Sequence, residues 1–271
     1  MSKEENESAK VVPGLEKLGQ PENSNIKRVI AVMSGKGGVG KSSVTALIAS
    51  ELHRRSRSVA ILDADITGPS IPRLFGLHGG SPTVLESRLV PETSSSGIRV
   101  MSISLLLERE DDPVIWRGPL IGGAVKQFWS DVVWGDVDYM VLDLPPGTGD
   151  APLTVLQSIP VDGIVIVSTP QELSAMVVKK AVNMAAMLDV PVVGLVVNMS
   201  WLTCPRCGEK IEPFGPVRAE NIARGLGLDL LGELPMDPDL STLADEGGIE
   251  EYRHPGVIDI VDKVVSAVPL A

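Results

Sequence analysis

The stretch SGKGGVGKSS, from Ser34 to Ser43, constrains the fold of this 271-residue chain more than any other stretch. An apolar run typical of a strand precedes it, and a helical pattern over residues 41–55 follows. It matches G-x-x-x-x-G-K-[ST], and a preceding strand and a following helix are the context in which this pattern forms a phosphate-binding loop. The glycines let backbone N–H groups converge on a phosphate, whose charge the helix N-terminus favours. The residues expected to bind a nucleotide here are Gly35, Lys36, Gly37, Gly38, Val39, Gly40, Lys41, Ser42 and Ser43.

Polar side chains suited to phosphate chemistry lie in this loop and after two later apolar runs. Lys41 is expected to contact the β- and γ-phosphates, and Ser42 to ligate Mg²⁺. Asp63 and Asp65 end the run SVAILDAD, and Asp143 ends the run DYMVLD. Such carboxylates can hold Mg²⁺ and its waters, or orient a water for attack on the γ-phosphate. One such aspartate is usually only a helix cap or a turn former, but three beside a phosphate loop favour the functional interpretation.

Apolar runs alternate with helical patterns from Arg28 onwards. Continuous apolar runs separated by helices indicate parallel strands that are buried on both faces. The sequence therefore predicts an α/β fold with a mostly parallel central sheet and helices on both faces. The expected strands are RVIAVMS, SVAILDAD, DYMVLDLP, GIVIVST, PVVGLVVNM and LLGELPM, and the expected helices include 41–55, 171–188 and 217–226. Residues 1–25 are predicted to form a flexible polar leader, and residues 26–271 a single nucleotide-binding domain.

Composition argues against two classes of partner. The formal net charge is −11 and aromatic residues make up 3% of the chain, which gives no support for a nucleic-acid surface. No apolar run approaches the roughly 20 residues of a membrane span, and MSKEENES does not resemble a signal peptide. The apolar C-terminal pattern over 254–271 contains one basic residue, Lys263, so we expect it to pack on the core instead of on a membrane. A cytoplasmic location is expected.

Both cysteines of the chain, Cys204 and Cys207, lie in one predicted loop, 200–215. Zinc or an iron–sulfur cluster usually takes four thiolate or imidazole ligands, and one C-x-x-C motif supplies two. The spacing of the three histidines does not suggest that they join the motif. Two copies of the motif at a two-fold axis would supply four thiolates for a [4Fe–4S] cluster or for zinc. A redox pair and two incidental thiols are the alternatives.

The motifs together resemble one known family. Lys36 adds an early lysine to the phosphate loop, which resembles the deviant loop of the MinD, ParA and nitrogenase iron-protein class. Within that class, DADITGPSIPRLFG, WRGP, DLPPGTGD, TPQELS and CPRCG are similar to motifs of the Mrp (ApbC) family of iron–sulfur cluster carrier ATPases. The resemblance extends from about Arg28 to the C-terminus.

The resemblance implies roles for individual catalytic residues. Lys36 is implied to reach across a homodimer interface to the partner's nucleotide phosphates, while Lys41 contacts those of its own chain. Asp65 is implied to orient the attacking water. Asp143 is implied to support Mg²⁺ through its water shell.

The resemblance also implies an adenine pocket. Asn198, at the end of VVGLVVNM, is similar to the residue that holds the base, and Pro235 and Asp237 of PMDPD are implied to complete the pocket. Asn198 could otherwise be a turn residue at the end of a strand.

The implied function is that of an ATP-binding, slowly hydrolysing carrier. A homodimer would hold a [4Fe–4S] cluster on Cys204 and Cys207 of both copies, receive it from an upstream donor and transfer it to apo-proteins. Zinc could take the place of the cluster. The alternatives are a positioning ATPase similar to MinD or ParA, and an electron donor similar to the nitrogenase iron protein. The segment DLPPGTGDAPLTVLQ lacks the cysteine that the latter requires.

Overall fold

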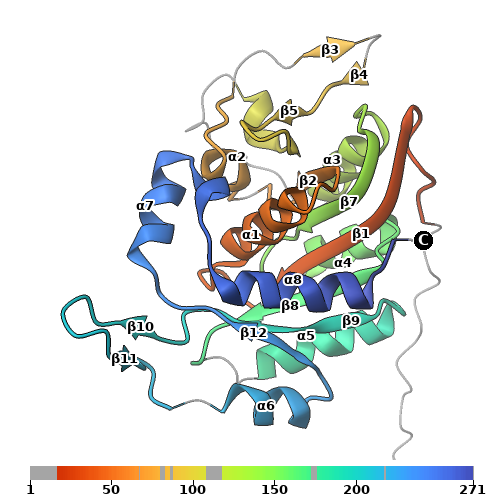
Figure 1. Cartoon of the computed structure of the whole chain (residues 1–271). Helices are drawn as coiled ribbons and strands as arrows, with labels where there is room; N and C mark the ends of the chain where they lie inside the picture. The colour runs from red at the N-terminus through yellow and green to blue at the C-terminus, as the bar shows by residue number, and fades with distance from the viewer. Residues whose placement is uncertain are drawn as a thin grey trace, which may run out of the picture.

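The computed structural model describes residues 17–66, 68–79, 83–85, 88–107, 118–171, 176–216 and 218–270. Its centre is an eight-stranded sheet in the order β12-β9-β8-β1-β7-β2-β6-β5 (Figure 1). Every neighbouring pair is parallel except β5 and β6. The strands are β1 (Ser24–Ser34), β2 (Val59–Asp63), β5 (Glu92–Thr93), β6 (Arg99–Met101), β7 (Gly135–Asp143), β8 (Gly163–Ser168), β9 (Val192–Val197) and β12 (Leu230–Glu233). The mostly parallel α/β sheet is confirmed.

Helices cover both faces of the sheet because its strands are apolar on both sides. Along β1, Ala31 and Met33 join one hydrophobic core, and Ile30 and Val32 join the other. Helices α3 (Gly118–Ser130), α4 (Asp150–Ser158), α5 (Met176–Met187) and α6 (Ala219–Gly225) contribute to the first core. Helices α1 (Lys41–Arg54), α2 (Ile71–Leu74) and α8 (Pro255–Ala267) contribute to the second. Helix α7 (Pro238–Glu246) and the short helices η1 (Ile103–Leu106) and η2 (Ile249–Glu251) complete the set.

All six expected strands are present, as β1, β2, β7, β8, β9 and β12. The helical patterns correspond to α1, α5 and α6. Residues 172–175 of the second pattern and residue 217 of the third lie outside the described residues. The C-terminal pattern forms α8, whose buried face packs on the core as predicted. No described helix is long and apolar enough to cross a membrane. Two small hairpins lie outside the sheet, β3 (Val84–Leu85) with β4 (Arg88–Leu89) and β10 (Leu202–Thr203) with β11 (Lys210–Ile211).

The predicted leader lies partly outside the described residues. Its described end, from residue 17, is tied to the domain, because the backbone N–H of Leu18 donates to the carbonyl of Ser158 at 2.8 Å. The indole N–H of Trp129 donates to the carbonyl of Gly19 at 2.9 Å. Strand β1 already begins at Ser24, inside the predicted leader. The described residues before Ile26 are therefore joined to the rest of the domain.

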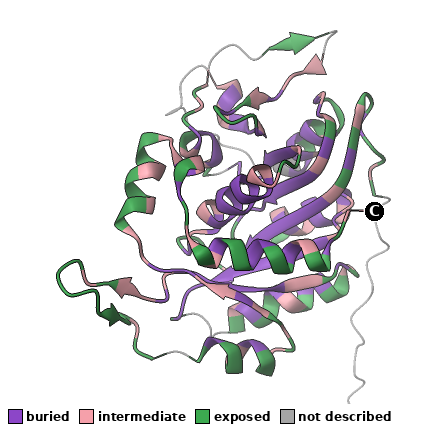
Figure 2. Ribbon diagram, in the orientation of Figure 1, coloured by how far each residue is buried: buried purple, intermediate pink, exposed green. Residues whose placement is uncertain are grey.

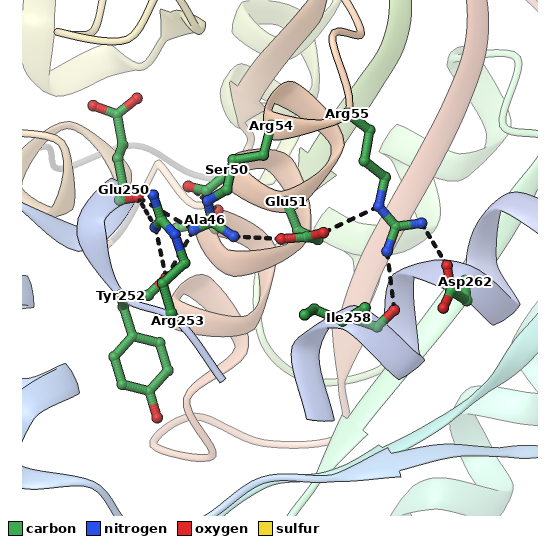
Figure 3. Close-up of polar contacts among 10 residues, drawn as sticks. All are labelled: Ala46, Ser50, Glu51, Arg54, Arg55, Glu250, Tyr252, Arg253, Ile258 and Asp262. Atoms are coloured by element: carbon green, nitrogen blue, oxygen red, sulfur yellow. Dashed lines mark hydrogen bonds and ion pairs between the residues drawn. The ribbon is translucent and has the colours of Figure 1, made fainter. Parts of the chain in front are cut away.

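A polar network joins the end of α1 to the C-terminal segment (Figure 3). Glu51 accepts hydrogen bonds from both Arg54 and Arg55 of its own helix. Arg54 also donates to the carbonyl of Tyr252 at 2.7 Å, and Arg55 to Asp262 of α8 at 2.6 Å. These contacts fix the far end of the helix whose near end follows the phosphate loop.

Candidate functional site

The loop between β1 and α1 has a backbone shape that requires glycine. Gly38 and Gly40 have φ angles of +83° and +79°, in the left-handed region. A Cβ atom on Gly40 would lie 2.2 Å from Nδ2 of Asn198, and one on Gly35 would lie 1.7 Å from a methyl carbon of Val177 in α5. A side chain at residue 35 or 40 would therefore push the loop away from α5 or from the end of β9.

Lys41, the first residue of α1, points into a buried group of polar side chains. Its ammonium group lies 2.7 Å from Oδ2 of Asp143 and 4.0 Å from Oδ2 of Asp65. Ser42 donates to the same Asp143 oxygen at 2.6 Å, and the hydroxyl of Thr45 lies 2.7 Å from the other oxygen. Three side chains of α1 therefore hold the Asp143 carboxylate. The predicted residues Lys41, Ser42, Asp65 and Asp143 are thus brought together, and Thr45, one turn after Lys41, joins them although no motif indicates it.

Asp63 lies beside Asp143 because β2 and β7 pair in parallel with these two residues in register. Its buried carboxylate accepts hydrogen bonds from the backbone N–H of Asp65 and the hydroxyl of Ser102, both at 3.1 Å. Burial raises the pKa of Asp63 to about 8, the negative charge of Asp143 adds to the rise, and the ammonium of Lys41 opposes it. Asp63 is therefore mainly protonated at neutral pH, and the short contact of Lys41 is with Asp143.

A cavity of about 310 Å³ opens over this group. The loop residues that line it, together with Lys41 and Asp65, are Gly37, Gly38, Gly40, Ser42 and Ser43. Lys36 is exposed on the same loop. Val39 is buried in the second core, so its side chain supports the loop from beneath. Glycine backbone, a lysine and a helix N-terminus around one cavity suit the phosphates of a nucleotide.

A larger cavity, of about 940 Å³, adjoins the first and shares Gly40 and Ser43 with it. Its lining includes the three residues expected at the base: Asn198, Pro235 and Asp237. The amide of Asn198 is buried and donates from Nδ2 to the carbonyl of Val39 at 3.0 Å. Asn198 thus joins the end of β9 to the phosphate loop, at the boundary between the two cavities.

The carboxylate of Asp237 already has two hydrogen-bond donors. As the N-cap of α7 it accepts from the backbone N–H of Asp239 at 2.9 Å. Its other oxygen accepts from the hydroxyl of Tyr252 at 2.7 Å, and burial with this hydrogen bond raises the pKa of Tyr252. The Asp237 side chain therefore shapes the wall of the cavity through its helix, a role that Tyr252 shares and that the sequence does not indicate.

The two cysteines lie in the turn of the β10–β11 hairpin. Figure 2 shows this hairpin as mainly exposed and projecting from the buried sheet. The N–H of Gly208 donates to the carbonyl of Cys204, and the N–H of Cys204 donates to the carbonyl of Glu209, each at 2.9 Å. Gly208 has a φ of +75°, which closes the turn. Cys204 is half-buried and Cys207 exposed.

The turn directs hydrogen-bond donors at the sulfur of Cys204. Hydrogen bonds from the backbone N–H groups of Arg206 and Cys207, and from the Cys207 side chain, lower the pKa of the Cys204 thiol. Within the part of the chain that the structure describes, no group of three or more His, Cys, Asp or Glu side chains could hold a metal ion. His254 instead caps α8, where its Nδ1 accepts from the backbone N–H of Gly256 at 3.1 Å. The hairpin thus offers two thiol ligands.

Solved structures resemble the fold of this chain. A nucleotide-binding protein from Archaeoglobus fulgidus, solved in complex with ADP and with cobalt, is 48% identical, with a TM-score of 0.77 over 85% of this chain and 90% of that one. The cell division ATPase MinD of Pyrococcus furiosus is 20% identical, with a TM-score of 0.59 over 89% of this chain and 98% of that one. The second likeness supports the fold alone.

Sequence relatives define the family. The iron–sulfur cluster carrier protein of Methanocaldococcus jannaschii is 46% identical over 225 residues, which are 83% of this chain and 78% of that protein. The iron–sulfur cluster transfer protein NUBPL of Dictyostelium discoideum is 44% identical over 223 residues, 82% of this chain and 69% of that protein. The family model described as ParA, NUBPL iron-transfer P-loop NTPase, matches residues 25–268. With its phosphate loop, its strand-end aspartates and this match over most of its length, the chain belongs to the NUBPL iron-transfer P-loop NTPase family.

Proposed function

We propose that this protein is an ATP-dependent carrier that holds an iron–sulfur cluster between two copies of the chain and transfers it to apo-proteins. The observation that carries the proposal is the exposed hairpin with two thiol ligands on a chain that also has a phosphate-binding site. The relatives named as iron–sulfur cluster carrier and transfer proteins support it. We further propose a cytoplasmic location, where both thiols stay reduced.

The nucleotide would bind across the two adjoining cavities, with its phosphates in the loop and its base beside Asn198. Lys41 would leave Asp143 for the β- and γ-phosphates, because its ammonium already lies at the floor of the phosphate cavity. Ser42 and Asp143 present oxygens 2.6 Å apart, the kind of ligand that Mg²⁺ prefers, either directly or through water. Bound Mg²⁺ would neutralise charge on the β- and γ-phosphate oxygens.

Hydrolysis would depend on residues at the mouth of the phosphate cavity. Asp65 lines that cavity and would orient the attacking water. The exposed Lys36 would reach the phosphates of the partner copy, so the full set of positive charges would assemble only in the dimer. Slow hydrolysis by the isolated chain follows from this arrangement.

The cluster is the cargo of this reaction. Two hairpins meeting at a two-fold axis would offer four thiolates to one [4Fe–4S] cluster. Backbone N–H groups already lower the pKa of Cys204, which favours the thiolate that ligates iron. A cluster held by exposed turns of two chains would be released more readily than one enclosed in a single core, which suits transfer.

Anaerobic reconstitution with iron and sulfide tests the proposal. The expected result is iron-dependent visible absorption and about one [4Fe–4S] cluster per dimer. Cys207→Ala should lose almost all bound iron, while Arg206→Ala, a change at an exposed position in the same turn, should keep it. Equal iron in the two variants would contradict the proposal.

Zinc is the second candidate, because a turn that directs N–H groups at a sulfur also suits zinc. Protein isolated anaerobically with zinc bound, and with neither iron nor sulfide, would instead identify a zinc-bridged dimer.

A further inference from the structure

The larger cavity has one wall that does not come from the nucleotide-binding core. Leu202, Thr203 and Pro205 of the cysteine hairpin line it, opposite the start of α7. Pro205 directly follows Cys204 in the sequence CPRC. The candidate metal ligands and the candidate base pocket therefore share a structural element.

The stem of the hairpin is joined to another wall of the same cavity. The backbone N–H of Ser200 donates to the carbonyl of Leu234 at 2.9 Å, and that of Met236 donates to the carbonyl of Trp201 at 2.6 Å. Met236 itself lines the cavity. The ammonium of Lys210 lies 4.3 Å from the centroid of the Trp201 ring, which ties the returning strand to the stem. A shift of the 234–236 segment would therefore move the hairpin.

The turn itself links the sulfurs to the cavity wall. The ring of Pro205 restricts the backbone directly after Cys204. The Gly208 N–H to Cys204 carbonyl hydrogen bond closes the turn around Pro205. A metal that drew the two sulfurs together would fix the position of Pro205, and a base that pressed on Pro205 would change the geometry of the sulfurs.

We propose that the cysteine hairpin forms part of the nucleotide site, with Thr203 and Pro205 as base-side contacts, so that metal on Cys204 and Cys207 and nucleotide bind with coupled affinities within one chain. This inference rests on the proposed function, since it requires both ligands. It differs from communication across a dimer interface, because the contact lies within a single copy. By linkage the coupling is reciprocal, so that a metal that changes the affinity for nucleotide has its own affinity changed by nucleotide in the same direction, typically about 5-fold or more.

Titration calorimetry on the full chain tests the coupling, with Zn²⁺ alone as the metal probe. The Kd of ADP is measured with and without Zn²⁺, and the Kd of Zn²⁺ with and without ADP. We expect both constants to change in the same direction, each by a factor of about 5 or more. In a variant with both Cys204→Ser and Cys207→Ser, ADP should still bind and Zn²⁺ should no longer affect it. An ADP Kd that is unchanged by Zn²⁺ in the wild-type chain would overturn the coupling.

A matched pair of proline variants tests, without any metal, whether the hairpin contacts the bound nucleotide. Pro205→Ala should weaken ADP about fivefold, through the loss of part of a ring contact. Pro213→Ala alters an exposed proline of the same segment that does not line the cavity, and it should leave the Kd unchanged. Equal ADP affinities in the two variants would contradict a contact between the hairpin and the bound nucleotide.

Hydrogen exchange gives a readout that is independent of affinity. The amides of Cys204 and Gly208 are hydrogen-bonded within the turn, and ADP should slow their exchange in the metal-free chain. Unchanged exchange would count against the proposal. A wild-type chain that failed to bind Zn²⁺ would instead contradict the coupling to zinc, and the iron reconstitution described above would test the proposed function separately. The proline pair would still show whether the hairpin lines the nucleotide site.

Discussion

The ammonium of Lys41 lies 2.7 Å from the carboxylate of Asp143, and both side chains are buried at the floor of the phosphate cavity. Asp63 stands in register beside Asp143, and the ammonium of Lys41 opposes the rise that burial causes in the pKa of Asp63. Removal of one partner of a buried ion pair leaves an uncompensated charge. Lys41 therefore contributes to the stability of the fold as well as to nucleotide binding.

Lys41→Ala is expected to lower the free energy of unfolding by about 3 to 5 kcal/mol, because the Asp143 carboxylate loses its counter-ion. Urea denaturation without nucleotide measures the change. The matched control is Lys36→Ala at the exposed lysine of the same loop, which should lower stability by about 1 kcal/mol or less, as the loss of an exposed charge does. Similar losses in the two variants would contradict the structural role of the buried ion pair.

Asp63 should make the stability of the wild-type protein fall as the pH rises. Its pKa is about 8 in the folded chain against 3.8 as the ordinary value, so between these two values the folded state binds more protons than the unfolded state. The stabilising effect is complete below pH 3.8 and is lost as the pH rises through 8. The slope from this one group reaches about 1.4 kcal/mol per pH unit.

Asp63→Asn isolates that contribution, when unfolding is followed from pH 5 to 9 in EDTA. The amide loses a hydrogen bond at every pH, which gives a constant offset, while the pH-dependent contribution disappears. The difference in unfolding free energy between wild type and variant should therefore change across the range, to the relative advantage of the variant at high pH. A difference that is independent of pH would show that Asp63 keeps an ordinary pKa.

Cys204 should react with iodoacetamide faster than Cys207 near neutral pH. The N–H groups of Arg206 and Cys207 lower the pKa of the Cys204 thiol, which raises its thiolate fraction. Mass spectrometry of the alkylated peptides, followed against pH, measures both rates. Cys207→Ser keeps a side-chain donor in place, so Cys204 should remain reactive in that variant. Faster alkylation of Cys207 in the wild-type protein, after correction for its greater exposure, would argue against a lowered pKa of the Cys204 thiol.

Tyr252→Phe should destabilise the protein by about 1.5 kcal/mol, because a half-buried carboxylate of Asp237 loses a charged hydrogen bond of 2.7 Å. It should also weaken ADP, since Asp237 begins the helix that lines the base cavity. Thr242→Ser keeps the hydroxyl of another cavity residue on the same helix and serves as the control. An unchanged ADP Kd in Tyr252→Phe would show that Tyr252 contributes to stability and does not affect nucleotide binding.

The local features of this fold could be predicted from sequence because they are encoded in consecutive residues. Strand β1, the glycine loop and the start of α1 follow from one motif and its context. Helix α3 could not be predicted in this way, since it contains Gly122, which reads as a helix breaker. A Cβ atom there would lie 2.5 Å from a methyl carbon of Thr154, so tertiary packing of α3 on α4 requires the glycine.

The candidate site also combines features that the sequence predicts with features that depend on tertiary packing. Lys41, Asp65 and Asp143 converge as expected, because the carboxyl ends of neighbouring parallel strands meet at one edge. The contact between the cysteine hairpin and the base cavity depends on how a projecting turn packs against distant elements. Neither periodicity nor spacing encodes that packing.

The ion pair of Arg55 at the end of α1 can form only late during synthesis of the chain. Arg55 pairs with Asp262, which lies 207 residues later in the chain. At about 5 to 20 residues per second, a ribosome takes about 10 to 40 s to cover that distance. During this interval the outer side of the phosphate-loop helix lacks its cover from α8. The face of α1 that packs against α8 therefore stays uncovered until the C-terminal segment has been synthesised.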